Sequence, residues 1–451
     1  MTQTKDMTIG NPSTLIIGFG LPLLIGNILQ QLYNMVDTIV VGRGIGVNAL
    51  AAVGATSSIN FLILGFIMGM AQGVSILTSQ FFGSKDYQKL RKSITMSLYI
   101  SIAVCVVMTT ISLTFIRPIL NLMGTPDSIL EDAICYIRVI FMGLTITYAY
   151  NFFSGILRAV GDSRNPVIAM IIACIVNIVL DVWFVIGLKI GVEGAAYATV
   201  IAQAFSAIYC FRSYLKIEET KIQKEDWNMG FELLKESFMI SLPVAIMNSI
   251  TAVGVMVLQS GVNTFGTDHI AAYSSSSKIM MILETISSTF GYACSTFVGQ
   301  NLGAKKLDRI LKGTNHMALI MGTFHIFLGI GMIFVTRWIL TMMIGADQKN
   351  VIEYGIQYMR INYIFIFILS LLWVYRCSLQ AMGDTILPMI SGIMEFISRI
   401  LFTLTLPGIL GFDGIALSEV SAWCAACILL IPAFYYRLKK IRNAELLLNE
   451  S

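Results

Sequence analysis

The second half of the chain repeats the first half at an offset of about 220 residues. The recurring motifs keep their order: Gly20-Leu21-Pro22 returns as Ser241-Leu242-Pro243, Gln80-Phe81-Phe82-Gly83-Ser84-Lys85 as Gln300-Asn301-Leu302-Gly303-Ala304-Lys305, Tyr136-Ile137-Arg138 as Tyr358-Met359-Arg360, and Ala159-Val160-Gly161-Asp162 as Ala381-Met382-Gly383-Asp384. Both halves are strongly apolar. Because such repeats are typical of two-lobed transport proteins, the sequence predicts two lobes of similar architecture.

Charged residues make up only 12% of the chain and hydrophobic residues 56%, with a mean hydropathy of +0.77. A soluble domain carries roughly 25% charged residues, so the composition predicts a polytopic membrane protein. The formal net charge of +4 is ordinary for such a protein, because its cytoplasmic loops are basic. The charge gives no indication of a nucleic-acid partner.

Twelve apolar stretches are long enough to cross a membrane, which takes about 20 residues. We therefore expect an all-α protein, with six membrane-spanning helices in each of two repeat-related bundles. The expected helices lie near 13–42, 49–82, 93–117, 130–156, 165–187, 193–213, 235–264, 270–299, 314–338, 352–380, 386–409 and 414–437. The expected domains are an N-terminal lobe over 1–213, a charged cytoplasmic linker over 214–234 and a C-terminal lobe over 235–451.

Lys and Arg are concentrated in the loops after helices 2, 4, 6, 8 and 12, as around Lys85, Lys216 and Lys305. Cytoplasmic loops carry this excess of positive charge. We therefore place the chain in the cytoplasmic (inner) membrane, multi-pass, with both termini in the cytoplasm. Because each half has an even number of helices, the lobes are parallel repeats.

Glycine and proline predict how two of the helices pack and bend. Gly65, Gly69 and Gly73 recur at four-residue spacing, which indicates a ridge of close helix packing. Pro22 and Pro243 fall inside expected helices, where proline removes a hydrogen bond and permits a bend. A static kink and a moving hinge are both compatible with this pattern.

Asp37 and Asp181 lie inside expected membrane helices, where a carboxylate is costly and is therefore a functional candidate. Each lies about five or six residues from the outer end of its helix, so the two share one depth. Asn177 is one turn from Asp181 on the same face, and Thr199 reaches that level in the next helix.

The repeat does not preserve these carboxylates, because Asp37 aligns with Leu258 and Asp181 with Thr403. This asymmetry predicts a role beyond holding the fold. Two neighbouring carboxylates in a low dielectric can hold a proton near neutral pH. The oxygen-rich set of Asp37, Asn177, Asp181 and Thr199 could instead bind Na⁺. An interhelical hydrogen-bond clamp is the structural alternative.

The second half carries charged residues of its own. Glu395 and Arg399 are four residues apart on one expected helix, which predicts an intrahelical ion pair. Glu284 lies near the middle of its helix and is a candidate cavity residue. Cys424 and Cys427 fall in an apolar helix without a second pair, and this pattern does not favour a metal site.

Several motifs occur together in a characteristic order. They are Pro22, the run Gln31-Leu32-Tyr33-Asn34-Met35-Val36-Asp37, Gln80-x-x-Gly83-x-Lys85-Asp86, Gly161-Asp162, Asn177-x-x-x-Asp181 and the run from Gly191 to Thr199. The set resembles the multidrug and toxic compound extrusion (MATE) family over essentially the whole chain, and its branch with a cation site in the N-terminal lobe. The resemblance implies a site of Asp37, Asn177, Asp181, the Ala195 backbone and Thr199, with Tyr33 and Asn151 in the surrounding polar network.

The expected function is a cation-coupled antiporter, driven by H⁺ or Na⁺, that exports amphipathic cationic organic compounds by alternating access. Pro22 is the expected hinge. No phosphate-binding loop of the Gly-x4-Gly-Lys-Ser/Thr type occurs, so an ion gradient remains as the energy source. We expect a monomer that is not an enzyme, has no cofactor besides the coupling ion, and contacts membrane lipid and small-molecule substrates. A lipid-linked precursor flippase and a passive facilitator are the alternatives.

Overall fold

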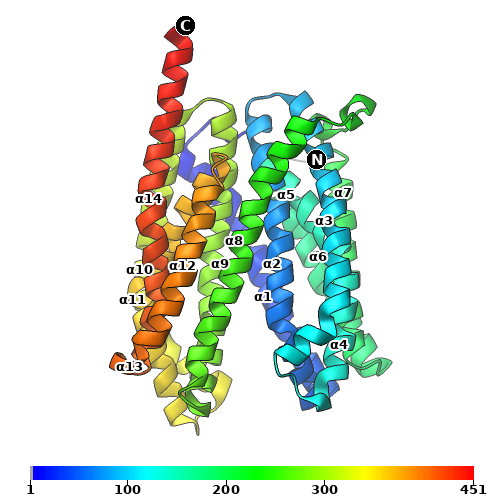
Figure 1. Ribbon diagram of the computed structural model, residues 1–451, viewed down its shortest axis with the longest axis vertical. Coiled ribbons are helices and arrows are strands. Elements are labelled where there is room, and N and C mark those ends of the chain that lie inside the picture. The colour runs from blue at the N-terminus through cyan, green and yellow to red at the C-terminus, as the bar shows by residue number, and fades with distance from the viewer. Residues whose placement is uncertain (1–3, 451) are drawn as a thin grey trace. The chain divides into compact units, whose positions relative to one another are not determined.

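The computed structural model describes residues 4–450, with side chains described as far as residue 447. This part of the chain is helical and has no strand, which confirms the all-α prediction (Figure 1). The elements are α1 (Pro12–Gly44), α2 (Val47–Gly83), α3 (Tyr87–Leu122), α4 (Asp127–Met142), α5 (Leu144–Ala159), α6 (Arg164–Asp181), η1 (Val182–Gly187), α7 (Val192–Tyr214), η2 (Glu218–Thr220), η3 (Lys224–Trp227), α8 (Phe231–Asn263), α9 (Thr267–Gly303), α10 (Leu307–Ile344), α11 (Lys349–Ala381), α12 (Ile386–Thr405), α13 (Pro407–Leu410) and α14 (Asp413–Glu450).

Each expected span corresponds to one helix or to two consecutive elements. Within the described residues, 10 helical segments are individually long and apolar enough to cross a membrane. The fourth and eighth expected spans are not among them. The fourth is divided between α4 and α5, which have 16 residues each, and the eighth is the more polar helix α9.

The prediction of one continuous helix over 130–156 is wrong, because the chain breaks at Gly143 between α4 and α5. A Cβ atom at Gly143 would lie 2.5 Å from a methyl group of Val200, so α7 approaches the backbone closely at this point. Only glycine leaves room for that approach. The break thus coincides with a close helix contact and with a residue of low helix propensity.

The helix that carries Asp181 changes its winding directly after this residue. Asp181 is the last residue of α6, and the chain continues as the π-helical element η1. π-Helical turns are rare and occur frequently at functional sites. A similar interruption ends α12, where the next helix, α13, begins at Pro407.

The described residues form two compact units, and the division falls inside α1 and α8. The first unit contains Gly18–Ala245 and the residues before Thr8, and the second contains Thr8–Ile17 and the residues from Ile246 onward. The expected lobe boundaries at 213 and 235 remain a prediction from the sequence.

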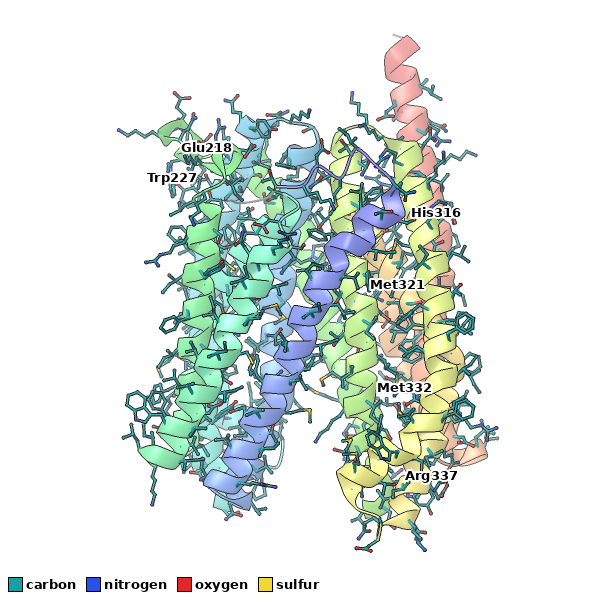
Figure 2. The ribbon with its side chains drawn as sticks, turned by 180° about the vertical axis from the view of Figure 1, so that it is seen from behind. Glu218, Trp227, His316, Met321, Met332 and Arg337 are labelled. Carbon is teal, nitrogen blue, oxygen red and sulfur yellow. The ribbon has the colours of Figure 1, made fainter. Side chains whose placement is uncertain are left out.

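In the first unit, α2 and α7 pack against α4 and α5 around a core of Ile, Leu, Val and aromatic side chains. In the second unit, α11 packs against α9, α10 and α14, and α12 packs against α14. His316, Met321, Met332 and Arg337 mark successive levels of α10 (Figure 2). The first turn of α1 belongs to this unit, because the hydroxyl of Ser13 lies 3.3 Å from Nδ1 of His316.

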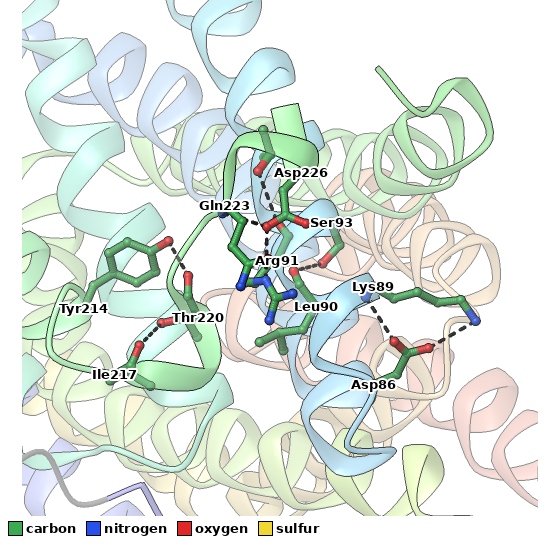
Figure 3. Close-up of polar contacts among 11 residues, drawn as sticks. Asp86, Lys89, Leu90, Arg91, Ser93, Tyr214, Ile217, Thr220, Gln223 and Asp226 are labelled. Atoms are coloured by element: carbon green, nitrogen blue, oxygen red, sulfur yellow. Dashed lines mark hydrogen bonds and ion pairs between the residues drawn. The ribbon is translucent and has the colours of Figure 1, made fainter. Parts of the chain in front are cut away.

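The expected linker is ordered on the start of α3 and contains η2 and η3, marked by Glu218 and Trp227 in Figure 2. The carboxylate of Asp226 accepts a hydrogen bond from Nε of Arg91 at 3.0 Å and another from the backbone N–H of Gln223 at 2.8 Å (Figure 3). Both ion-pair side chains are largely buried. These contacts anchor the linker to the first unit.

The glycine ridge in α2 packs as predicted, against the first half of α8. A Cβ atom at Gly69 would lie 2.5 Å from Cα of Ala245, and one at Gly73 would lie 2.4 Å from Cα of Ser241. Real Cβ atoms do not approach backbone this closely. Glycine therefore allows α2 and α8 to come together at these two positions.

We expect Gly73→Ala to lower the stability of the protein by about 1–3 kcal/mol, because the added methyl group overpacks the interface with Ser241. Gly54→Ala is the matched control in the same helix, since a Cβ atom at Gly54 meets nothing within 4 Å. The melting temperature of each variant in detergent measures the effect. Equal melting temperatures for the two variants would contradict a tight contact at Gly73.

The predicted ion pair between Glu395 and Arg399 is wrong. Glu395 instead accepts a hydrogen bond from Nη2 of Arg376 on α11, and both side chains are buried, at 3% and 4% exposure. Arg376 also donates to the hydroxyl of Ser391 at 3.2 Å. Glu395 pairs with another helix because α11 places the guanidinium group of Arg376 beside the buried carboxylate. Residue spacing along α12 alone cannot reveal this partner.

Candidate functional site

Helices α1 and α6 lie together along the segments that carry the two predicted aspartates. A Cβ atom at Gly26 would lie 3.0 Å from the sulfur of Met170, and Gly44 lies against the π-helical element η1. Gly26 and Met170 are thus in contact, and each aspartate lies 11 residues further along its own helix, Asp37 on α1 and Asp181 on α6. Because both helices run in the same direction here, with the same rise per residue, the two carboxyl groups reach the same level.

The carboxyl groups of Asp37 and Asp181 are close enough to interact electrostatically. Asp181 is fully buried and Asp37 is half-buried. Oδ1 of Asp37 and both carboxylate oxygens of Asp181 receive no hydrogen bond from any described residue. An ionised carboxylate accepts hydrogen bonds and donates none, so neither ionised aspartate can supply a hydrogen bond to the other. These oxygens are therefore available to accept a proton or to coordinate a cation.

Asn177 extends this set of unsatisfied groups by one turn along α6. Its side chain is 1% exposed, and neither its amide oxygen nor its amide nitrogen has a hydrogen-bond partner among the described residues. The other two predicted ligands, Ala195 and Thr199, lie on α7, which packs against α6. Ala195 is fully buried and Thr199 is half-buried.

Tyr33 lies one turn before Asp37, is buried, and interacts electrostatically with it. Its hydroxyl interacts with the side chains of Gln30 and Gln203. Asn151 has a local partner, because its amide nitrogen donates to the backbone oxygen one turn earlier, on Thr147, at 2.9 Å.

Two residues of this region did not emerge from sequence reasoning as site residues. Tyr136 on α4 is buried and interacts electrostatically with Asp37, Asp181 and Tyr33. Gln203 follows Thr199 by one turn on α7 and has an unsatisfied amide oxygen. In the sequence, Tyr136 is distinguished only by its place in the repeated Tyr-x-Arg motif, and no sequence pattern distinguishes Gln203 as a site residue.

The two remaining predicted residues lie apart from the aspartate pair along the chain. Pro22 lies inside α1, which continues through it. Glu284 lies midway along α9, is exposed, and interacts electrostatically with Glu419, Arg399 and Arg376 of the second unit.

The donor atoms of the pair and of Asn177 are oxygens, which suit H⁺ or Na⁺ better than a transition metal. No group of three or more His, Cys, Asp or Glu in the described part of the chain is placed to hold a metal ion. The orphaned oxygens of Asp37, Asp181 and Asn177 thus fit a small hard cation or a proton.

These observations define a multi-pass helical membrane protein with an ionisable site in its first unit. The MatE family model matches residues 22–183 and 243–405, one match in each half of the repeat. The chain therefore belongs to the MatE family. This membership confirms the predicted resemblance to the family, whereas the branch with a cation site in the N-terminal lobe remains a prediction. Together with the multidrug resistance relatives described next, it shows that the protein is a transporter and not an enzyme.

The chain is 30% identical over 300 residues to the probable multidrug resistance protein YoeA of Bacillus subtilis (strain 168), an alignment that spans 65% of each chain. It is 25% identical over 459 residues to the probable multidrug resistance protein YpnP of the same strain, covering 98% of this chain and 99% of that one. The fold matches the outward-facing structure of a multidrug resistance MATE family transporter of the MOP superfamily, with a TM-score of 0.90, 23% identity and coverage of 98% and 99%.

Proposed function

We propose that this protein exports amphipathic, cationic organic compounds across the cytoplasmic membrane, driven by H⁺ or Na⁺ binding at the Asp37–Asp181 pair. One observation carries the proposal. The carboxyl groups of Asp37 and Asp181 are adjacent although they belong to different helices, and three of their oxygens accept no hydrogen bond from a described residue. A site of this kind changes its charge when a proton or cation enters. The names of the relatives YoeA and YpnP support drug export as the activity.

Ion binding drives transport only if the ion has a different affinity for the two access states. Ionised, Asp37 and Asp181 repel each other and hold α1 away from α6. A proton or Na⁺ between them removes the repulsion and favours closer packing of the two helices. The change in the position of α1 is the proposed coupling step.

Pro22 is the proposed hinge of α1. Proline has no backbone N–H, so the helix lacks one hydrogen bond there and bends at lower cost. The division between the two compact units crosses α1 between Ile17 and Gly18, shortly before Pro22. One helix is thereby shared by both units and also carries Asp37.

The test is export of a fluorescent cation from proteoliposomes that contain the purified protein, with the H⁺ and Na⁺ gradients imposed separately. We expect uphill movement of the dye with at least one gradient and none without a gradient. A facilitator would only equilibrate the dye under every condition, and that result would refute coupled export.

A further inference from the structure

The second unit has an open cavity at the end that the distribution of Lys and Arg predicts to be cytoplasmic. The cavity has a volume of about 370 Å³ and lies between the start of α10 and the last turns of α14. Four basic groups and two carboxylates give its lining a formal net charge of +2. These charged residues are Lys305, Lys306, Arg309, Arg442, Asp308 and Glu445.

The two lysines bring positive charge to the cavity that no neighbouring carboxylate neutralises. Asp308 is already engaged, because it accepts a hydrogen bond from Nη2 of Arg442 at 2.6 Å. Among the described side chains, no carboxylate lies within ion-pair distance of Lys305 or Lys306. Lys306 donates to the backbone oxygen of Thr8 at 2.9 Å, which is a neutral acceptor. This bond uses one of the three N–H donors of the ammonium group.

Arg309 is held in a fixed orientation where it lines the cavity. Its Nε donates to Oδ1 of Asn301 at 2.9 Å and its Nη1 donates to the backbone oxygen of Gly10 at 2.8 Å. The guanidinium carbon lies 5.7 Å from the centre of the Phe297 ring. A side chain ordered in this way loses little conformational entropy when it contacts a ligand.

The corresponding position of the first unit is neutralised from within. The repeat alignment pairs Asp86 with Lys306 and Lys89 with Arg309. In the first unit, Asp86 forms an ion pair with Lys89 at 3.2 Å and also accepts a hydrogen bond from its backbone N–H (Figure 3). A lysine replaces this aspartate in the second unit. The excess of positive charge is therefore particular to the second unit and is not a property of the repeated architecture.

The cavity lies near the level of lipid headgroups. Tyr435 and Tyr436 on α14 are 42% and 68% exposed, and tyrosine is enriched where membrane helices meet the water interface. Arg442 follows Tyr436 by six residues, which is about 9 Å along the helix. The headgroup layer extends about 5–8 Å beyond the hydrocarbon core. Long Lys and Arg side chains at this level reach the phosphate groups of lipids.

We propose that this cavity binds the phosphate group of an anionic membrane lipid, with Lys305, Lys306 and Arg309 as its charged contacts. The ligand class is a phospholipid with a net negative charge, for which phosphatidylglycerol is the probe. Lys and Arg form strong charge-assisted hydrogen bonds with phosphate oxygens. A free phosphate ion shares this chemistry, but the position of the cavity beside an interfacial helix favours a lipid. The site goes beyond the proposed export function, because it holds a component of the membrane.

Native mass spectrometry of the purified full-length protein in detergent tests the proposal. Titration with phosphatidylglycerol or phosphatidylcholine of identical acyl chains gives the dissociation constant of the first bound lipid. We expect the parent to prefer phosphatidylglycerol. Lys305→Gln and Lys306→Gln should each weaken its binding about fivefold, the equivalent of about 1 kcal/mol for one basic side chain at an anionic lipid surface, and leave phosphatidylcholine binding within about twofold.

Lys85→Gln is the matched control, because Lys85 is the repeat-related residue of Lys305. Both lysines have the same left-handed backbone conformation, with φ of 59° and 55°. The control should bind phosphatidylglycerol as the parent does. Glu445→Gln tests the sign of the effect, since it raises the net charge of the lining to +3 and should strengthen binding about fivefold.

Soluble glycerol phosphate separates a lipid site from a site for free phosphate. It should not displace phosphatidylglycerol at equal concentration, because it has no acyl chains to bring it to the membrane level. Displacement by glycerol phosphate, equal binding of the two lipids by the parent, or parent-like binding by Lys306→Gln would overturn the proposal. The assay requires no transport, so its outcome is independent of the export proposal.

Discussion

Asp37→Asn and Asp181→Asn should each abolish gradient-driven export, reducing dye movement to the level of protein-free vesicles. Each variant leaves one carboxyl group without its ionisable neighbour. Binding of a proton or Na⁺ then no longer removes a repulsion between two negative charges, so it no longer changes the packing of α1 against α6. Dye export from proteoliposomes under imposed H⁺ and Na⁺ gradients measures the loss. Asp132→Asn is the control, because Asp132 is an exposed acidic residue on α4.

The same two variants distinguish coupling from a structural clamp. Asparagine supplies an N–H donor to the remaining carboxylate and removes the repulsion between two buried charges. We therefore expect the melting temperature in detergent to stay the same or rise. A lower melting temperature together with near-normal export would show that the aspartates stabilise the fold and do not carry the coupling ion.

Arg376→Gln and Glu395→Gln should each lower the free energy of unfolding by about 3–5 kcal/mol, because each leaves an uncompensated charge in the interior of the second unit. Thermal unfolding in detergent measures the loss. Arg337→Gln is the matched control. Its partner is Glu353 at 2.7 Å, but both side chains are about 60% exposed, so the expected loss is below about 1 kcal/mol.

Replacing both members of the buried pair, in Arg376→Met with Glu395→Met, should recover most of the stability, since no unpaired charge remains. The double variant should also retain gradient-driven export. If Glu395→Gln is instead as stable as the parent but fails to transport, the Arg376–Glu395 pair takes part in the transport cycle.

Features that follow from local sequence were predictable. Apolar length fixed the positions of the spans, and the repeat fixed their division into two similar halves. The common depth of Asp37 and Asp181 followed from the constant rise of the α-helix. Close packing along the glycine ridge of α2 was also predictable from the sequence, because small residues at four-residue spacing permit close helix packing.

Other features depend on which helix faces which, and only the tertiary structure decided them. The helix break at Gly143 lies where Val200 of α7 packs onto the backbone. Glu395 pairs with Arg376 on α11 and not with Arg399 on its own helix, and Tyr136 of α4 joins the aspartate site. Helical periodicity shows which face a residue occupies, but it carries no information about the partner across that face. The sequence by itself therefore determined the spans, the repeat and the common depth of the two aspartates, whereas packing between distant segments decided the partners of each buried polar group.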